Sequence, residues 1–275
     1  FRRCLLEAYL RKRGKIMKSA FVIAKKEARA FFTQPTFYVI AGLLTVVFSF
    51  LFIIGVTQFA QVAQSMMMQP GAPAQQGNIH YAVFLRHLSI LNLMLIFVVP
   101  AFTMKLFSEE KKMRTFDLLL TCPVNSVEIA MGKFLGAAAA VGGIVLIALI
   151  YPVSSIIFVQ KISWAPLLIS FLGLYLVGLV YVSMNLFCSS LTESILISYI
   201  MSVILNVSIW FVGQGVEMVD GQVARQIFEH ISLNYHLAGL VEGTIRSQSL
   251  IFLLSLSGLF IFLTERVVES HRWRA

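Results

Sequence analysis

The sequence predicts an all-α membrane protein with six transmembrane helices. Of its 275 residues, 58% are hydrophobic and only 13% are charged, whereas a soluble domain carries about 45–50% apolar and about 25% charged residues. Six long apolar runs have no charge in their cores. Lysine and arginine, which leave a net charge of +9, are concentrated on alternate sides of these runs. Together these features argue against a soluble globular domain.

The apolar runs are expected to be helices. A helix needs roughly 20 apolar residues to cross a bilayer, and unpaired backbone groups are costly in hydrocarbon. The runs lack the alternation that strands of a membrane barrel require. The expected spans are residues 37–56, 88–104, 134–159, 165–188, 195–212 and 250–264.

The distribution of lysine and arginine predicts the orientation. Counted over the segments between the runs, one side holds 18 of these residues and the other holds four. Positive charge accumulates on the cytoplasmic side of membrane proteins, so both termini are expected in the cytoplasm of a multi-pass protein of the plasma (inner) membrane. This asymmetry accounts for most of the basic charge, and no nucleic-acid partner is needed to explain it.

The segments outside the spans differ in character. Residues 1–16 are strongly basic, and three origins are open for them: a genuine N-terminal extension, the boundary of a fragment, or a start codon assigned too far upstream. Residues 17–275 are expected to form one transmembrane domain. Residues 57–87 are rich in Gln, Met, Pro and Gly and predict a loose loop. Val223 to Ile231 has apolar residues at helical spacing, which predicts a short helix at the outer surface.

The segment from Lys18 to Phe32 predicts an amphipathic helix before the first span. Aromatic residues and alanines, including Phe21 and Phe31, fall near one face, and the charged residues lie elsewhere. Basic side chains combined with aromatic anchors are typical of a helix in the interfacial plane. The residues assigned to this interfacial helix are Lys25, Lys26, Glu27 and Phe31.

The loop after the second span is the most informative segment. From Ser108 to Val124 it begins with mixed charges, becomes apolar and ends at a proline. Asn125 and Glu128 then form a helix-capping pattern. We therefore predict a short cytoplasmic helix, a turn, and a third span that is entered through Gly132 and Lys133.

This loop resembles the ABC type-2 permease family, whose hallmark reads approximately E-E-K-x-x-G-T-x-E-L-L-L-T-x-P-V before a glycine–lysine pair. Arg114 stands where the family usually has glycine, and Asp117 where it usually has glutamate. The closest pattern is that of permeases from gliding-motility-associated and copper-enzyme maturation ABC exporters. The matching or conservatively replaced residues are Glu109, Glu110, Lys111, Thr115, Asp117, Leu118, Leu119, Leu120, Thr121, Pro123, Gly132 and Lys133.

The resemblance implies a permease subunit of an ABC transporter, whose short cytoplasmic helix docks on a separate ATPase chain, and it implies export rather than import. It also implies a second permease subunit, in a homo- or heterodimer, and contact with membrane lipid. ATP and Mg are expected in the partner ATPase and no cofactor in this chain, which lacks a phosphate-binding glycine loop. The residues assigned to ATPase coupling are Glu109, Glu110, Lys111, Arg114, Thr115, Phe116, Asp117, Leu118, Leu119, Leu120 and Pro123.

Small and polar residues within the spans predict helix packing. Gly132, Gly136 and Ala140 recur every fourth residue, a spacing that permits close helix contact. We expect these small residues to pack against another helix of the same chain rather than at a dimer interface. A dimer contact stays open as the alternative, because the family works with two permease subunits. Asn92, Asn185 and Asn206 are interpreted as forming interhelical hydrogen bonds rather than as substrate ligands.

Other functional classes have less support. The alternative to an ABC permease is a secondary transporter or a membrane scaffold that needs no ATPase. A membrane-embedded enzyme would need a catalytic grouping, which the sequence lacks. The three cysteines and five histidines are widely spaced, so no metal site is expected and the histidines are interpreted as surface residues.

Overall fold

The computed structural model describes residues 19–68, 83–116, 124–154, 164–215 and 222–272, and these are helical apart from short turns. A helix over residues 19–33 comes first. The remaining helices are α2 (Pro35–Met68), α3 (Leu85–Thr103), α4 (Lys105–Lys112), α6 (Ser126–Ser154), α7 (Trp164–Leu191), α8 (Ile195–Gly215), α9 (Gln222–Ile231), α10 (Leu233–Val241) and α11 (Ser247–Arg272).

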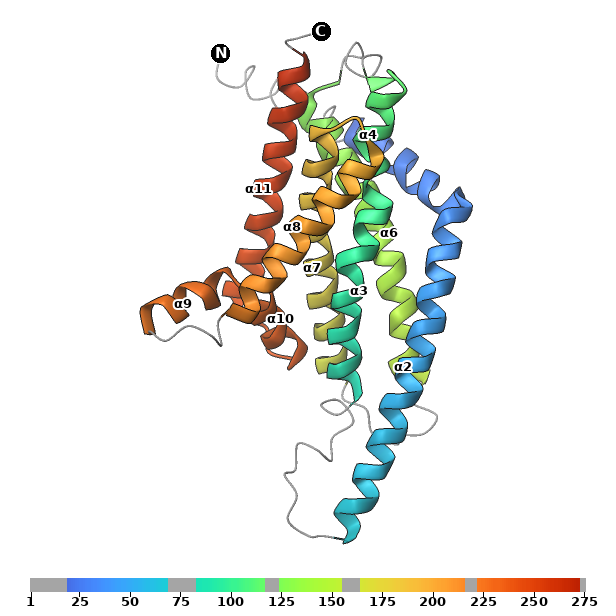
Figure 1. Ribbon diagram of the computed structural model, residues 1–275, viewed down its shortest axis with the longest axis vertical. Helices are drawn as coiled ribbons and strands as arrows, with labels where there is room; N and C mark the ends of the chain where they lie inside the picture. The colour runs from blue at the N-terminus through green and yellow to red at the C-terminus, as the bar shows by residue number, and fades with distance from the viewer. Residues whose placement is uncertain (1–18, 69–82, 117–123, 155–163, 216–221, 273–275) are drawn as a thin grey trace, which may run out of the picture.

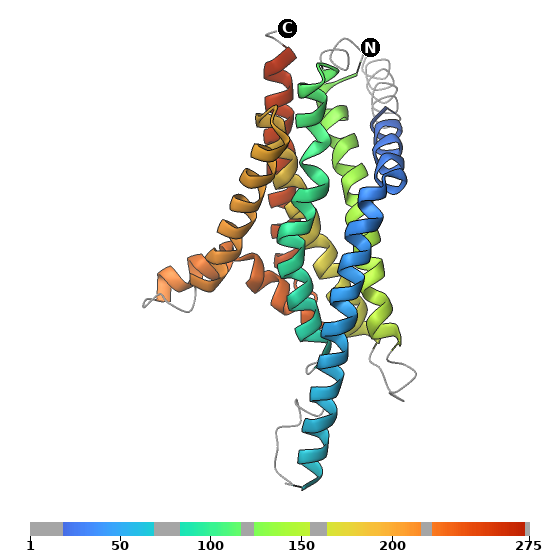
Figure 2. The same cartoon turned by 45° about the vertical axis from the view of Figure 1, so that its right-hand side comes forward.

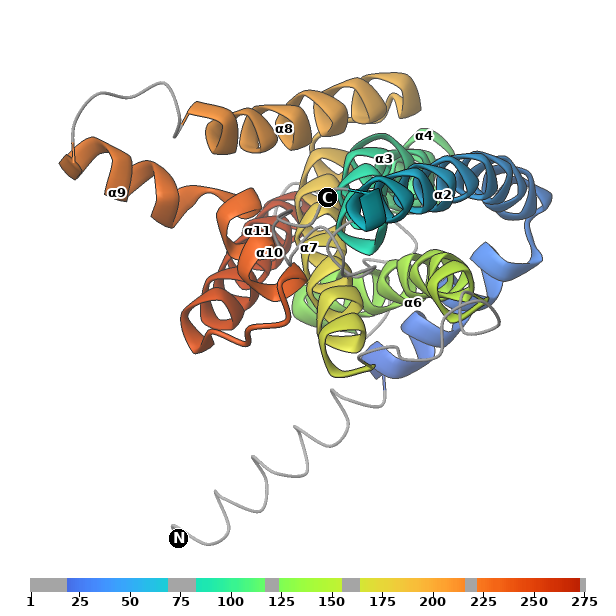
Figure 3. The ribbon, with the colours of Figure 1, turned by 90° about the horizontal axis from the view of Figure 1, so that it is seen from below.

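Helix α7 lies at the centre of the bundle. It touches α3, α4, α6, α8, α10 and α11, and the view along the bundle shows it surrounded by these helices (Figure 3). Most of its side chains are apolar and they are found on every face, and Val177, Val180 and Val182 are fully buried. A helix that is hydrophobic on every face is stable only when it is enclosed.

Six helices of the described residues are long and apolar enough to cross a membrane, which confirms the predicted all-α membrane class. They are α2, α3 with α4, α6, α7, α8 and α11. The outer helices expose large apolar side chains such as Phe50 on α2, Leu196 on α8 and Ile251 on α11. In a bilayer these side chains face lipid, so their exposure is no aggregation hazard there.

Helix 19–33, α4 and the last turn of α11 lie at one end of the bundle, together with the turn between α7 and α8 (Figure 1). We call this the basic end, because most of the described lysine and arginine residues are found there. The opposite end carries α9 and α10 (Figure 1).

Helix α2 is longer than predicted. It continues to Met68, and residues 83–87 are helical at the start of α3, so the prediction of a loose loop is wrong for residues 57–68 and 83–87. The physical reason for the extension of α2 is composition: residues 57–68 are rich in Gln, Ala and Met, which favour helix, and Pro70 is the first breaker. The extension projects beyond the neighbouring helices (Figure 2). Residues 69–82 of the predicted loop lie outside the described residues.

The third span begins earlier than its apolar run, because α6 starts at Ser126. The backbone N–H of Asn125 donates to Oε2 of Glu128 at 3.3 Å, and the amide of Glu128 donates to the carbonyl of Asn125 at 2.9 Å. The first bond confirms the predicted role of Glu128, in which a glutamate at the third helical position satisfies the amide of the cap residue, and the second is the first backbone turn of the helix. Residues 155–159 of the predicted span lie outside the described residues.

The outer end contains two short helices, of which only the first was predicted. Helix α9 matches the predicted amphipathic segment and points away from the bundle (Figure 1). Helix α10 was missed. It begins at a cap formed by Ser232, whose hydroxyl accepts a hydrogen bond from the amide of Tyr235 at 3.1 Å. Its buried Leu237 and Leu240 pack beneath the bundle.

The prediction that the histidines lie at the surface is wrong for two of them. His87 on α3 and His236 on α10 are only 4% and 2% exposed. Nε2 of His236 donates to the carbonyl of His230 at 3.0 Å, and Nδ1 lies 3.1 Å from the hydroxyl of Ser249. Because a carbonyl can only accept, Nδ1 of the neutral ring accepts from the serine. His236 therefore ties α9, α10 and α11 together.

Pro100 leaves a gap in the hydrogen bonding of α3, and α8 fills it. A proline has no N–H, so the carbonyl of Ile96 loses the donor that residue 100 would otherwise supply. Nδ2 of Asn206 on α8 donates to that carbonyl at 3.2 Å. In hydrocarbon, neighbouring helices must satisfy such freed groups. The predicted interhelical role is thus confirmed for Asn206, and also for Asn92, whose Oδ1 accepts from Tyr181 at 3.3 Å.

Helix α8 attaches to the bundle through a narrow polar stripe. Its buried residues are Ser198, Ser202 and Asn206, which follow one another at every fourth position. On the facing helix α7, Asn185 is fully buried, and neither of its amide atoms has a hydrogen-bond partner within the described residues. The interhelical hydrogen bond predicted for Asn185 is therefore absent there.

Candidate functional site

The candidate site is centred on Lys133, near the start of α6 at the basic end. Its side chain is only 1% exposed. The ammonium group donates to the carbonyl of Leu106 at 2.6 Å, to Oε1 of Glu110 at 2.7 Å and to Oε1 of Glu27 at 3.4 Å. All three donors of the lysine are therefore used. It also lies 5.1 Å from the ring centre of Phe107.

These contacts join three elements through one buried charge: helix 19–33 supplies Glu27, α4 supplies Glu110 and α6 supplies Lys133. Lys26 adds a second cation, 3.2 Å from Oε1 of Glu27 and 3.9 Å from Oε1 of Glu110. Two positive and two negative groups thus balance. A buried charge is tolerated only when it is paired and hydrogen-bonded, so the three elements are expected to move together.

Two glycines allow helix 19–33 to reach this cluster. A Cβ atom added at Gly132 would meet Ile23 at 2.7 Å, and one added at Gly136 would meet Cβ of Glu27 at 2.5 Å. The predicted small-residue packing is thus an intrachain contact at these positions. Ala20, Ala24, Glu27 and Phe31 form the buried face. The assignment of Phe21 to that face is wrong, because its side chain is 66% exposed.

A second network ties α4 to α7 and α11. The hydroxyl of Ser189 accepts from the amides of Phe107 at 3.0 Å and Ser108 at 3.3 Å, and donates to the carbonyl of Met104 at 3.1 Å. Lys111 donates to the carbonyl of Ser190 and lies 2.9 Å from Nε2 of His271. Together with the Lys133 cluster, this network connects α4 to four neighbouring helices.

The backbone at the end of α4 explains why the family pattern has a glycine at the position of Arg114. The amide of Arg114 donates to the carbonyl of Lys111, and the amide of Thr115 to that of Glu110, both at 3.0 Å. This pair of bonds is a Schellman cap, which places its penultimate residue in the left-handed region. Arg114 has φ = 56°. Glycine suits that conformation best, so a glycine is the expected residue here and Arg114 carries strain.

The segment that follows α4 is held at its far end by α11. The hydroxyl of Ser126 donates to Glu269, and Arg272 donates to the carbonyl of Val124 at 3.4 Å. Residues 117–123, which include the predicted coupling residues Asp117, Leu118, Leu119, Leu120 and Pro123, lie outside the described residues. Before residue 117, Lys111 contacts His271 of α11, so the chain on both sides of residues 117–123 is attached to the same end of α11.

The remaining predicted coupling residues divide into buried and exposed sets. Glu110 and Lys111 lie in the two networks, and Phe116 is buried, with its ring 6.0 Å from that of Phe107. Glu109, Arg114 and Thr115 are exposed. Lys25 and Lys26 are exposed on helix 19–33, whereas Glu27 and Phe31 are buried. The exposed set forms the solvent-facing surface of the site.

Sequence reasoning assigned Lys133 only to the opening of a span and missed its central position. That Lys133 is paired with an acidic residue could have been predicted, because an ionisable residue next to an apolar run requires a partner. Its partners are 23 and 106 residues away, so they could not be named from local pattern. The role of Ser189 was missed for the same reason.

Within the described residues the chain has six candidate membrane spans, the second of which continues into α4 at the basic end, and this arrangement is that of a multi-pass membrane protein. The family model described as ABC-2 family transporter protein matches residues 21–261, and the chain belongs to that family. It is accordingly a permease subunit of an ABC transporter. No curated protein shows significant similarity to the chain. Within the described ranges, no group of three or more His, Cys, Asp or Glu residues could hold a metal ion.

Proposed function

We propose that this permease receives a separate ATPase chain at its basic end and exports a substrate or acts on envelope partners. The basic end then faces the cytoplasm of a plasma (inner) membrane, as the excess of lysine and arginine there suggests. ATP and Mg are bound by the ATPase, and a second permease subunit, identical or related, completes the complex.

The observation that carries this proposal is the double attachment of α4. The Lys133 cluster binds it to helix 19–33 and α6, and the Ser189 and Lys111 contacts bind it to α7 and α11. A force applied to α4 is therefore distributed over four helices rather than absorbed by a flexible loop. Coupling between distant sites needs such a continuous physical connection.

Exposed residues beside α4 provide a surface for the ATPase. Met113 has 68% of its surface exposed, and its neighbours Lys112, Arg114 and Thr115 are also exposed. The two exposed cations, Lys112 and Arg114, favour a polar contact with a partner, next in sequence to Leu118, Leu119 and Leu120, which were assigned to ATPase coupling from the sequence. Charged residues around a contact guide orientation and partner choice.

The test is site-specific photo-crosslinking. A benzophenone amino acid is placed at Met113, or at Val223 on the opposite end as a matched exposed control. The permease is expressed with the ATPase chains encoded beside it and illuminated in membranes. We expect a crosslink to an ATPase from position 113 but not from position 223, and its loss in the Leu119→Asp variant.

Crosslinking from neither position would overturn ATPase docking at this end, provided that both proteins are present in the membrane. Equal crosslinking from both positions would overturn the assignment of the site. Co-purification followed by an ATP hydrolysis assay then distinguishes docking from coupling. A Leu119→Asp complex that assembles and hydrolyses ATP as the wild type does would contradict the proposed contact.

A further inference from the structure

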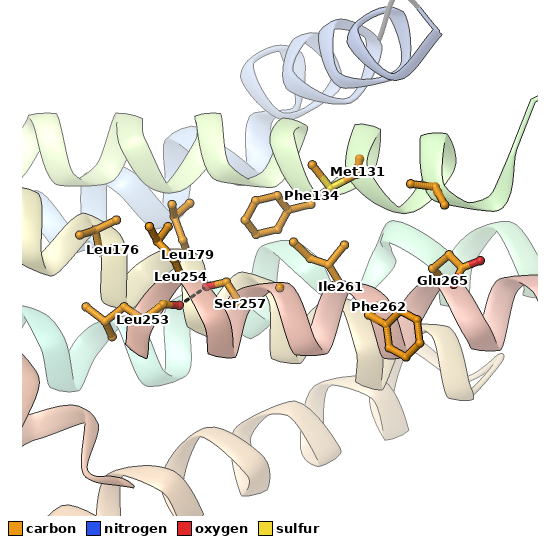
Figure 4. A pocket seen from close by; sticks show the side chains of 12 residues that line it. Met131, Phe134, Leu176, Leu179, Leu253, Leu254, Ser257, Ile261, Phe262 and Glu265 are labelled. Carbon is orange, nitrogen blue, oxygen red and sulfur yellow. Dashed lines mark hydrogen bonds between the residues drawn. The ribbon is translucent and has the colours of Figure 1, made fainter. Parts of the chain in front are cut away.

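An apolar groove runs along the membrane-facing side of the bundle between α6 and α11. Its volume is about 410 Å³, and its lining comes from α6, α7 and α11 and includes Phe134, Leu179, Leu254, Ser257, Gly258 and Glu265. Figure 4 shows α6 and α11 as its two walls, with Glu265 near one end. Ser257 donates its hydroxyl to the carbonyl of Leu253 at 2.9 Å, so it offers no unsatisfied donor to a ligand.

The groove exists partly because residue 258 is a glycine. A Cβ atom at Gly258 would meet nothing within 4 Å, which places open space beside this point of α11. The α11 residues that line the groove recur at three- and four-residue spacing, from Leu254 to Glu265. This stripe is about 16 Å long at the rise of an α-helix. That length accommodates a large part of one extended acyl chain.

The end of the groove carries a matched pair of charges. Glu265 is the first charged residue after the apolar part of α11, and a charged residue at the end of an apolar span is expected close to the membrane–water interface. Nε of Arg266 lies 3.2 Å from Oε2 of Glu265, and 63% of the arginine side chain is exposed. A carboxylate beside an exposed guanidinium complements a head group that contains an ammonium and a phosphate.

We propose that this groove binds one acyl chain of a phospholipid with a primary-amine head group. The ammonium of the lipid pairs with Glu265, and its phosphate pairs with Arg266. Lipid tails are as apolar as leucine, so selectivity comes from shape and from the head group rather than from burial of apolar surface. This inference does not rest on ATPase docking, and its test measures bound lipid instead.

The test fills the groove. Gly258→Leu adds a side chain where there is open space, and leucine also favours helix over glycine, so the variant is expected to fold. Gly42→Leu on α2 is the matched control, because Gly42 also has nothing within 4 Å of an added Cβ. Each protein is purified in detergent with phosphatidylethanolamine or phosphatidylglycerol, and retained lipid is measured by native mass spectrometry.

We expect the wild type and Gly42→Leu to retain phosphatidylethanolamine, and Gly258→Leu to lose this lipid-bound species. Glu265→Gln should lower retention of this lipid by about threefold, as expected for loss of a partly exposed ion pair, without lowering that of phosphatidylglycerol. Leu254→Trp provides a second block of the same groove. Wild-type retention in both blocking variants would overturn the site, and equal retention of the two lipids by the wild type would overturn the proposed head group.

Discussion

At the scale of single residues, Lys133 is the side chain on which the basic end most depends. Its ammonium is enclosed by groups from helix 19–33 and α4. One carboxylate oxygen of Glu110, Oε2, is buried without a hydrogen-bond partner in the described residues. The carboxylate therefore relies on Lys133 and Lys26 for compensation, because a buried charge with incomplete hydrogen bonding is costly.

We predict that Lys133→Met lowers the free energy of unfolding by about 3–5 kcal/mol, since it leaves buried carboxylates without their cation. The triple variant with Glu27→Gln and Glu110→Gln should recover a large part of this loss. Titration with a denaturing detergent measures both effects. Lys112→Met is the control, because Lys112 is exposed. A triple variant less stable than Lys133→Met would show that the charges are not the cause.

His236 gives the outer end a dependence on pH. Burial lowers its pKa below the ordinary value of 6.5, the bond to the carbonyl of His230 acts in the opposite direction, and charge repulsion from the His230 ring lowers the pKa a little further. The folded state therefore binds a proton less readily than the unfolded state. As pH falls below about 6.5, the stability of this region decreases, until the lowered pKa of the folded state is reached.

Hydrogen exchange of α10 should accordingly be faster at about pH 5.5 than at about pH 7.5, after correction for intrinsic rates. The His236→Phe variant should remove most of this difference. His230→Gln is the control and should keep most of this difference, because it preserves the burial of His236 and the backbone carbonyl that His236 contacts and removes only the smaller charge repulsion from His230. If His236→Phe retains the full pH effect, another group is responsible.

At the scale of elements, α3 and α8 are joined by a hydrogen bond from one buried side chain. Asn206 supplies the donor that Pro100 removes from α3, and α3 passes into α4 four residues later. The polar stripe of α8 is thus connected to the helix that carries the candidate site. A kink at a proline normally has such a compensating partner.

We predict that Asn206→Leu destabilises the protein by about 1–2 kcal/mol, the scale of an interhelical hydrogen bond in a membrane. In the Pro100→Ala background the cost should be smaller, because residue 100 then donates to Ile96 itself. A double-mutant cycle measures this coupling. Ser208→Ala on the exposed face of α8 is the control. Additive effects of the two changes would contradict the proposed compensation.

At the scale of the whole molecule, the number and order of the spans follow from hydropathy, and the structure confirms both. The ends of the helices were less predictable. The Asn125 cap was recognisable because its partner Glu128 is close in sequence. The equivalent cap at Ser232 was overlooked, and α10 was missed with it. The extension of α2 was missed because its Gln- and Met-rich residues are polar or weakly apolar but still favour helix.

The candidate site was predictable in location but not in its connections. The family pattern marked α4 and the residues around it, including Glu110 and Lys111. The contacts that give the site its rigidity join residues far apart in the chain, such as Glu27 with Lys133. Local periodicity carries no information about such pairs. The backbone conformation of Arg114 was partly predictable, because the glycine that the family has at that position already indicated a positive φ.

The long α2 also has an electrostatic consequence. The sequence contains no Asp, Glu, Lys or Arg between Arg29 and Arg86, and α2 occupies residues 35–68 of this interval. Moving a formal charge into hydrocarbon is expensive, but sliding α2 along its own axis moves none. A shift of one helical turn, about 5.4 Å, would exchange only uncharged side chains between water and lipid. An axial shift of α2 would therefore carry no free-energy cost for transferring a formal charge of this helix from water into hydrocarbon.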